Sequence, residues 1–287
     1  MVCILNFHVA RALNISYIRA KHLFDLFESL IPTKGRNQGF VTLRFDDASV
    51  QQYEYALPIL EKFNMHGVLA VPTKWIGDRS RLVQSRYQPM ETWDKVKEFV
   101  KMGWEIASHS RYHRHDRITK GPWTKLTVKE LHEEIIDSKR DIIKNLGIEP
   151  YTMVLPGITT AQNPITLREK HLICKQYSAL SLSSNLKVFN RLGRNPYNLW
   201  AIPLHWSTDI FAKVEKITRI SKNKAFWVIF YIHKISDDLS DPLTSMKPSQ
   251  LKALVEILAA DEDLNVVTIR QGVELGCPDQ KVQVHQV

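Results

Sequence analysis

The chain has 287 residues, of which 44% are hydrophobic and 24% are charged. This composition is typical of a folded globular protein and excludes disorder over most of the chain. The net charge of +9 would suit a nucleic-acid binder or a protein that acts on anionic glycans. The basic residues are dispersed, however, and their densest cluster, His109 to Arg117, contains three histidines. This cluster favours metal chemistry, so we expect no nucleic-acid partner.

Three cysteines, Cys3, Cys174 and Cys277, lie far apart and form no Cys-x-x-Cys pair. A cysteine zinc site or a dense disulfide framework is therefore not expected. The N-terminus has no charged start followed by a long apolar stretch, as a signal peptide would. The longest apolar run, residues 225–232, is too short to cross a bilayer, which takes about 20 residues. We expect a cytoplasmic protein without a membrane span, and no sequence feature predicts the oligomeric state.

Short apolar segments, typical of buried parallel strands, alternate along the chain with segments of helical periodicity. The predicted strands are residues 3–7, 40–45, 68–71, 104–107, 151–155, 179–182, 201–204, 226–232 and 264–269. This alternation predicts an α/β protein with a parallel sheet. About eight strands in a chain of this size suit a closed β/α barrel. A doubly wound open sheet is also compatible with the pattern.

Helix start and stop signals lie between these strands. Residues 92–102 place apolar side chains on one face of a helix. Thr127 and Glu130 form a capping-box pattern for a second helix, which Gly147 is expected to end. Pro248 suits the first turn of a third helix.

Five polar side chains follow the ends of three predicted strands, where α/β barrels carry their catalytic groups. Asp46 and Asp47 end one strand, and His109 and His113 follow another. Two imidazoles and one carboxylate form a familiar zinc-binding set with an open position for water. His233 follows an apolar strand, and its imidazole suits proton transfer near neutral pH. Helix capping or strand termination could explain each residue singly, but together they predict a metal-dependent hydrolase.

On these residues the sequence resembles the polysaccharide deacetylases, also called the NodB-homology domain or carbohydrate esterase family four. The family's first motif, typically T-F-D-D-G, corresponds to R-F-D-D-A from Arg44 to Ala48. The second, H-S/T-x-x-H, corresponds to residues 109–113, and the last, a strand that ends in F-H or L-H, to residues 229–235. The resemblance covers residues 3 to 272, nearly the whole chain.

The resemblance implies a distorted (β/α) barrel, often of seven parallel strands. We expect this domain at residues 1–275, with an N-terminal strand extension, and a flexible tail at residues 276–287. By position in the motifs, Asp47, His109 and His113 would hold one divalent metal ion, and zinc suits two nitrogens and one oxygen. Asp46 would be the general base that activates water. His233 would be the general acid that protonates the leaving amine.

Two motifs depart from the family pattern. Ala48 stands where relatives have glycine. The third motif, usually R-x-P-x-G, reads V-L-P-G from Val154 to Gly157, so the arginine that orients the base carboxylate is missing. Either Arg44 or Arg194 is a candidate to replace that arginine. Otherwise the departure predicts reduced activity.

The resemblance implies removal of acetyl groups from N-acetylated sugars or glycans. Pro156, Gly157 and Trp206 are the residues expected to contact the substrate or the oxyanion, and Trp206 could stack on a sugar ring. One alternative is a non-catalytic carbohydrate-binding relative, which the altered third motif favours and which turnover of an acetylated sugar would exclude. Another is an O-acetyl esterase on the same site, which parallel assays of xylan acetate and chitooligosaccharides would separate.

Overall fold

The chain divides into two units, Met1–Arg36 and Asn37–Val287. The computed structural model describes parts of the second unit: residues 38–80, 82–83, 86–87, 89–114, 126–160, 164–184, 188–204, 210–224, 226–237 and 245–276. The predicted strand 3–7 and the predicted tail beyond Gly276 lie outside the described residues. The predicted domain limits therefore stay a prediction.

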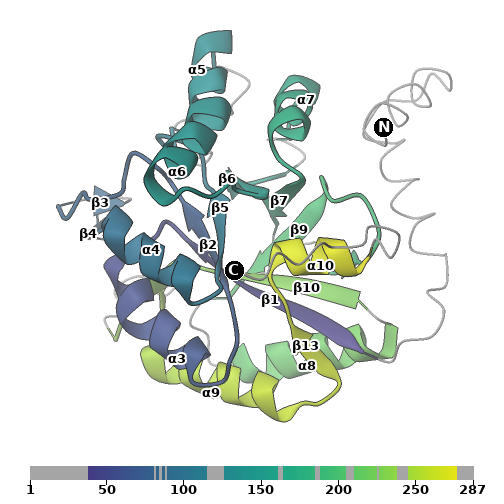
Figure 1. Ribbon diagram of the computed structural model, residues 1–287. Coiled ribbons are helices and arrows are strands. Elements are labelled where there is room, and N and C mark those ends of the chain that lie inside the picture. The colour runs from purple at the N-terminus through teal and green to yellow at the C-terminus, as the bar shows by residue number, and fades with distance from the viewer. Residues whose placement is uncertain are drawn as a thin grey trace, which may run out of the picture. The chain divides into compact units, whose positions relative to one another are not determined.

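A closed barrel of parallel strands forms the centre of the second unit (Figure 1). Its strands follow the order β1-β2-β5-β6-β7-β9-β10, and β1 pairs with β10 to close the ring. Their bounds are β1 Gly39–Asp46, β2 Val68–Val71, β5 Glu105–Ser108, β6 Thr152–Ile158, β7 Ala179–Ser183, β9 Leu199–Pro203 and β10 Phe226–Ile232. The predicted distorted β/α barrel of about seven strands is confirmed, and closure excludes the doubly wound open sheet.

Shorter strands lie outside the barrel ring. β13 (Leu264–Val266) pairs in parallel with β1, and β8 (Asn190–Arg191) pairs antiparallel with the start of β10. Two small sheets are formed by β3 (Leu82–Val83) with β4 (Arg86–Tyr87), and by β11 (Lys234–Ile235) with β12 (Ser245–Met246).

The predicted strand 264–269 is wrong at its end, because α10 (Ile269–Leu275) begins at its last residue. Thr268 accepts the backbone N–H of Gln271, and the Gln271 side chain accepts the backbone N–H of Thr268. This capping box favours a helix over an extended strand there.

Helices surround the barrel between its strands (Figure 1). Their bounds are η1 Gln52–Ala56, α3 Leu57–Glu61, α4 Trp93–Lys101, α5 Val128–His132, η3 Glu133–Asp137, α6 Ser138–Leu146, α7 Leu167–Gln176, α8 Ile210–Lys224 and α9 Pro248–Ala260, where η marks a π-helical turn. The predicted capping box of Thr127 and Glu130 is confirmed. Gly147 ends α6 at a φ of 72°, a left-handed conformation that glycine adopts without strain. Pro248 lies in the first turn of α9.

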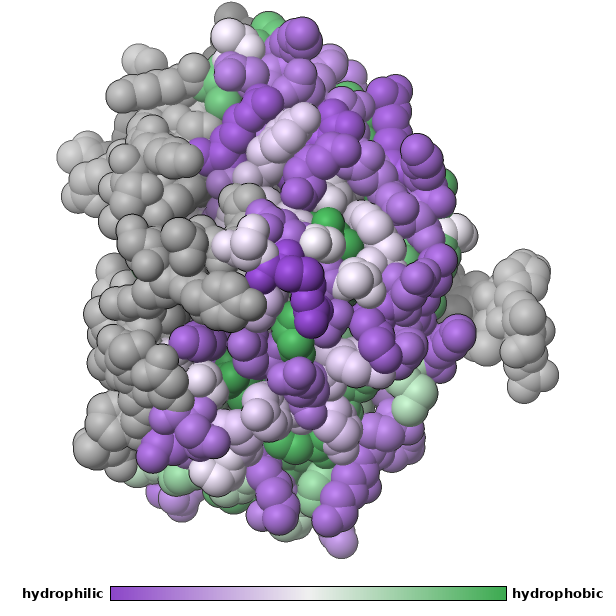
Figure 2. Space-filling view, turned by 90° about the vertical axis from the view of Figure 1, so that its left-hand side faces the viewer, coloured by the Kyte–Doolittle hydropathy of each residue, from purple (hydrophilic) through white to green (hydrophobic). Residues whose placement is uncertain are grey.

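The helices bury one side and leave the other in water. On the side of the molecule where α3 and α4 lie, the surface is predominantly hydrophilic, and hydrophobic residues form small separate areas (Figure 2). None of the helices in the described part of the chain is long and apolar enough to cross a membrane.

Side chains alternate between the inside of the barrel and the helices around it, as the period of a strand requires. On β1, Val41, Leu43 and Phe45 join the large apolar cluster with the surrounding helices. The inward cluster contains a few large side chains, such as Phe40 and Trp227, and several small ones: Ala70, Ala107, Ala179 and Ala201. The small side chains leave room for polar groups in the barrel.

Trp227 fixes how closely α10 can approach the barrel. Its ring is 1% exposed, and its Nε1 donates to Thr42 Oγ1 at 2.9 Å. A Cβ atom at Gly272 would lie 2.5 Å from Trp227 Cζ2. We therefore expect Gly272→Ala to lower the free energy of unfolding by about 1–3 kcal/mol, despite the better helix propensity of alanine. Chemical denaturation measures the free energy of unfolding. In a Trp227→Phe background, Gly272→Ala should cost less free energy, because the smaller ring leaves room for the added methyl group. Strictly additive effects of the two substitutions would contradict the close contact.

Candidate active site

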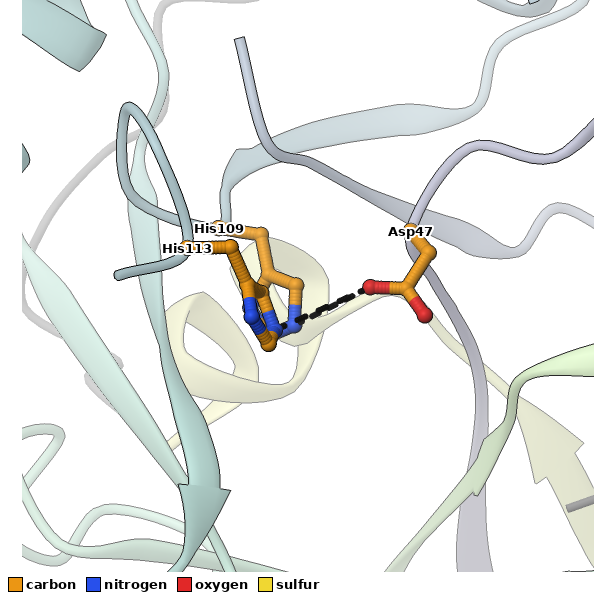
Figure 3. Close-up of side chains that lie close together, drawn as sticks. All are labelled: Asp47, His109 and His113. Carbon is orange, nitrogen blue, oxygen red and sulfur yellow. Dashed lines mark ion pairs between the residues drawn. The ribbon is translucent and has the colours of Figure 1, made fainter. Parts of the chain in front are cut away.

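Asp47, His109 and His113 converge at the carboxyl ends of β1 and β5 (Figure 3). Asp47 Oδ1 lies 3.8 Å from Nε2 of each histidine, and one potential ligand atom from each residue lies within 4.8 Å of the other two. Two ligands bound to a tetrahedral ion at zinc distances lie about 3.4 Å apart. The three side chains therefore fit a divalent ion after small movements. The donor set, two imidazoles and one carboxylate, suits zinc and neighbouring transition metals.

The ring of His109 is held in the tautomer that a metal ligand needs. Its Nδ1 lies 3.0 Å from the carbonyl oxygen of Val154, which can only accept, so Nδ1 carries the hydrogen. The lone pair is then on Nε2, which faces Asp47. Burial lowers the pKa of His109, although the carboxylates of Asp46 and Asp47 oppose this shift. A neutral imidazole with a fixed second nitrogen is the usual form of a histidine ligand.

Strained backbone concentrates at this site. Asp47, Ala48, Ser110 and His113 have φ values of 81°, 54°, 66° and 51°. In the described part of the chain, the other non-glycine residue with positive φ is Asn64. Each such conformation costs about 1–2 kcal/mol, and strain of this kind clusters at functional sites. Ala48 thus adopts a left-handed conformation, which glycine, the usual residue at this position of the motif, adopts with less strain.

Glu134 holds the loop that carries the two histidines. This side chain is fully buried in η3. It accepts the Tyr112 backbone N–H at 3.0 Å, and Arg114 Nε lies 3.4 Å from it. Burial raises the pKa of Glu134 against these opposing contacts. The buried carboxyl group therefore supports the turn between His109 and His113.

Asp46 lies beside the metal-ligand cluster and is paired with Arg44. Arg44 Nε donates to Asp46 Oδ1 at 2.8 Å and Nη2 to Oδ2 at 2.7 Å. Burial raises the pKa of Asp46, but Arg44, His109 and His233 together outweigh burial, and the resulting pKa is lowered. Asp46 is therefore ionised at neutral pH. Arg194, the other candidate arginine, follows β8, which pairs with the start of β10; Asp46 lies at the opposite end of the barrel.

His233 follows the end of β10, next to the end of β1. The pairing of Phe45 with Ile232 places Asp46 and His233 one step further along the two strands. Gln52 joins these strand ends, because its Nε2 donates to the Asp46 carbonyl at 2.5 Å and to the His233 carbonyl at 2.6 Å. The ring of His233 stands edge-on to Tyr231, with centroids 5.4 Å apart. Gln52 thus holds the two strand ends together.

The altered third motif lies on β6 at the same end of the barrel. The register between β6 and β7 shifts between Val154 and Ile158, so Pro156 and Gly157 lie in an irregular stretch. Gly157 has a φ of 74°, a conformation that favours glycine. Trp206, the third residue predicted to contact substrate, lies outside the described residues.

Several residues at the site were not predicted from the sequence: Gln52, Trp75, Glu134, Ser181 and Ser183. The sequence could have indicated Ser181 and Ser183, since they alternate with leucine in A-L-S-L-S and therefore share one face of a strand. Trp75 packs on His113 with ring centroids 4.6 Å apart, and its indole N–H donates to the Tyr112 carbonyl at 3.1 Å. Gln52, Trp75 and Glu134 carry no sequence pattern that marks their role.

Residues 33–171 match the family described as Polysaccharide deacetylase. This match covers just under half of the chain and supports deacetylation of carbohydrates as the activity. Comparison of the sequence with curated proteins gave no match.

Several solved structures are similar to this chain. The Bc1960 peptidoglycan N-acetylglucosamine deacetylase has a TM-score of 0.52 at 12% identity, over 85% of this chain and 91% of that one. The peptidoglycan deacetylase PdaC from Bacillus subtilis has a TM-score of 0.45 at 18% identity, over 84% of this chain and 92% of that one. IcaB from Ammonifex degensii has a TM-score of 0.48 at 20% identity, over 62% of this chain and 72% of that one. At 12% identity, the likeness to Bc1960 concerns the fold.

Proposed function

We propose that this protein is a metal-dependent hydrolase that releases acetate from N-acetylated sugars or glycans. The observation that carries the proposal is the convergence of Asp47, His109 and His113 next to a buried, ionised Asp46. These groups supply the ligands for one divalent ion, most simply zinc, and a base beside it. The match of residues 33–171 to the polysaccharide deacetylase family supports the same reaction.

In the proposed mechanism, a divalent ion held by Asp47, His109 and His113 would lower the pKa of water and polarise the acetyl carbonyl. Asp46 accepts the proton of the attacking water, because its carboxylate is ionised and is paired with Arg44. His233 donates a proton to the nitrogen that leaves as an amine. Pro156 and Gly157 lie at the irregular end of β6, where the backbone N–H of Gly157 is a candidate donor to the oxyanion.

The proposed substrate class is a glycan that contains N-acetylglucosamine. The similar structure Bc1960 is named as a peptidoglycan N-acetylglucosamine deacetylase. Trp206 is proposed to stack on a sugar ring. An O-acetyl esterase on the same site is the second candidate, since its reaction would use the same base and ion.

Acetate release from N-acetylglucosamine oligomers tests the proposed function directly. Xylan acetate assayed in parallel tests the esterase alternative. Chelation should abolish release, and one equivalent of zinc should restore it. Turnover that persists after complete metal removal would contradict the metal-dependent mechanism, and no turnover on either substrate would favour a carbohydrate-binding relative.

The proposed ligand set predicts one divalent ion per chain. We expect His113→Ala to weaken binding of Co²⁺ by at least about a hundredfold, because one of three protein ligands is lost and the remaining two cannot complete the set. Quenching of tryptophan fluorescence during titration reports the binding, since Trp75 packs against His113 at 4.6 Å. Trp75→Phe is the control: it should retain the ion by elemental analysis and lose most of the quenching. Equal affinity in His113→Ala and the parent would remove His113 from the ligand set.

A further inference from the structure

The barrel interior contains Arg44, which stands where the family's first motif typically has threonine. Arg44 is completely buried and is among the largest fully buried side chains of the described residues. It lies on β1, two residues before Asp46, in a strand whose eight residues are all buried. An arginine in such a place is costly unless its charge is paired and its donors are used.

Each edge of the guanidinium group has a partner. Nε and Nη2 donate to the two oxygens of Asp46 at 2.8 and 2.7 Å. Nη1 donates to Ser181 Oγ at 2.7 Å, and Nη2 also donates to Ser183 Oγ at 2.9 Å. The ring of Tyr231 lies on another side, 5.0 Å from Cζ. The two-point contact with Asp46 fixes the plane of the carboxylate, which a lysine could not do.

The barrel wall is built to admit this group. The side chains around the interior are small at Ala70, Ala107, Ala179 and Ala201. Ser181 and Ser183 come from β7, which does not neighbour β1 in the barrel order. The serine hydroxyls therefore hold the guanidinium across the interior of the barrel, and the arginine cannot turn away from Asp46.

We propose that Arg44, held by Ser181 and Ser183, is the positioning residue that orients Asp46 for catalysis. This proposal rests on the proposed function, in which Asp46 is the general base. The orienting arginine is then supplied by β1 and steadied by β7. Asp46 can therefore be oriented even though position 154 on β6, where the family's third motif has arginine, is valine.

Two variants test the role of Arg44. Arg44→Lys keeps the charge but cannot make the two-point contact, and Ser181→Ala with Ser183→Ala frees the guanidinium without removing it. We expect kcat for acetate release to fall about a hundredfold in Arg44→Lys and about tenfold in the serine double variant, since a small misplacement of a catalytic group has effects of this size. KM and metal affinity should stay within about twofold, because orientation of the base matters in the transition state.

Tyr177→Phe is the matched control. It removes a buried hydroxyl that bonds Ser138 and the Ile135 carbonyl in the cluster around α7. It should lower thermal stability without changing kcat. If the Arg44 and serine variants also lose stability while kcat stays at the parent value, the ion pair is structural and the proposal is overturned. If Arg44→Lys does not fold, kcat of the serine double variant decides whether Arg44 positions Asp46.

A second readout does not depend on activity. The carboxyl ¹³C resonance of Asp46, identified by its loss in Asp46→Asn, should shift or broaden in Arg44→Lys and in the serine double variant. It should be unchanged in Tyr177→Phe. If the parent releases no acetate, the proposed function fails, and this resonance alone decides whether Arg44 orients Asp46. An Asp46 resonance unchanged in the Arg44 and serine variants would overturn the proposal.

Discussion

Asp46→Asn is expected to reduce acetate release by about a hundredfold or more while one divalent ion stays bound. Asparagine matches the size of aspartate but cannot accept the proton of the attacking water. The ion should remain, because the proposed ligands are Asp47, His109 and His113. Acetate release measures the first effect, and elemental analysis of the purified variant measures the second.

The same substitution should also lower stability. Asp46 is the charge partner of Arg44, and both are buried. Removing one partner of a buried ion pair costs about 3–5 kcal/mol. Folding of Asp46→Asn must therefore be confirmed by circular dichroism, and rates must be measured well below its unfolding midpoint.

Asp47→Asn separates the two carboxylates. It should lose both the ion and the activity, yet remain more stable than Asp46→Asn, because the pair of Arg44 and Asp46 is intact. If Asp46→Asn instead loses the ion while Asp47→Asn keeps it, the proposed roles of the two aspartates are exchanged. Full turnover in Asp46→Asn would show that another group is the base.

The strands that were predicted most accurately are continuous apolar runs. Residues 68–71 and 226–232 were predicted and are observed as β2 and β10 with the same bounds. Both are buried within the barrel, where burial selects the same residues that the apolar pattern marks. The prediction at 264–269 was wrong because Val267 prolongs the apolar run, although Thr268 already caps a helix. Strands of two residues, such as β8, are too short for periodicity to mark them.

The part of the site that could be predicted from the sequence consists of polar side chains that directly follow strand ends. Asp47, His109 and His113 could be proposed together because carboxyl ends of parallel strands meet at one edge of a barrel. The choice between Arg44 and Arg194 could not be made, since it depends on which end of the barrel each residue occupies. The contact of Arg44 with Ser181 spans 137 residues, and no local pattern encodes a pairing at that separation.

His233→Ala is expected to damage hydrolysis of an N-acetyl sugar more than hydrolysis of an activated acetate ester. An amine must be protonated as it leaves, and the proposed role of His233 is to give that proton. An activated ester has a leaving group that departs without it. We expect the amide rate to fall about a hundredfold and the ester rate to change by less than about tenfold.

Because of the position of His233, its replacement should affect proton transfer without disturbing the fold or the metal ligands. The side chain follows β10, and its backbone is held through the Gln52 bond to its carbonyl, which the alanine variant keeps. The fold should therefore be preserved, and the metal ligands are untouched. His171→Ala, at an exposed position of α7, is the control and should leave both rates unchanged. The decisive quantity is the ratio of amide to ester rates in variant and parent: if both rates fall equally, or neither falls, His233 is not the acid that serves the leaving amine.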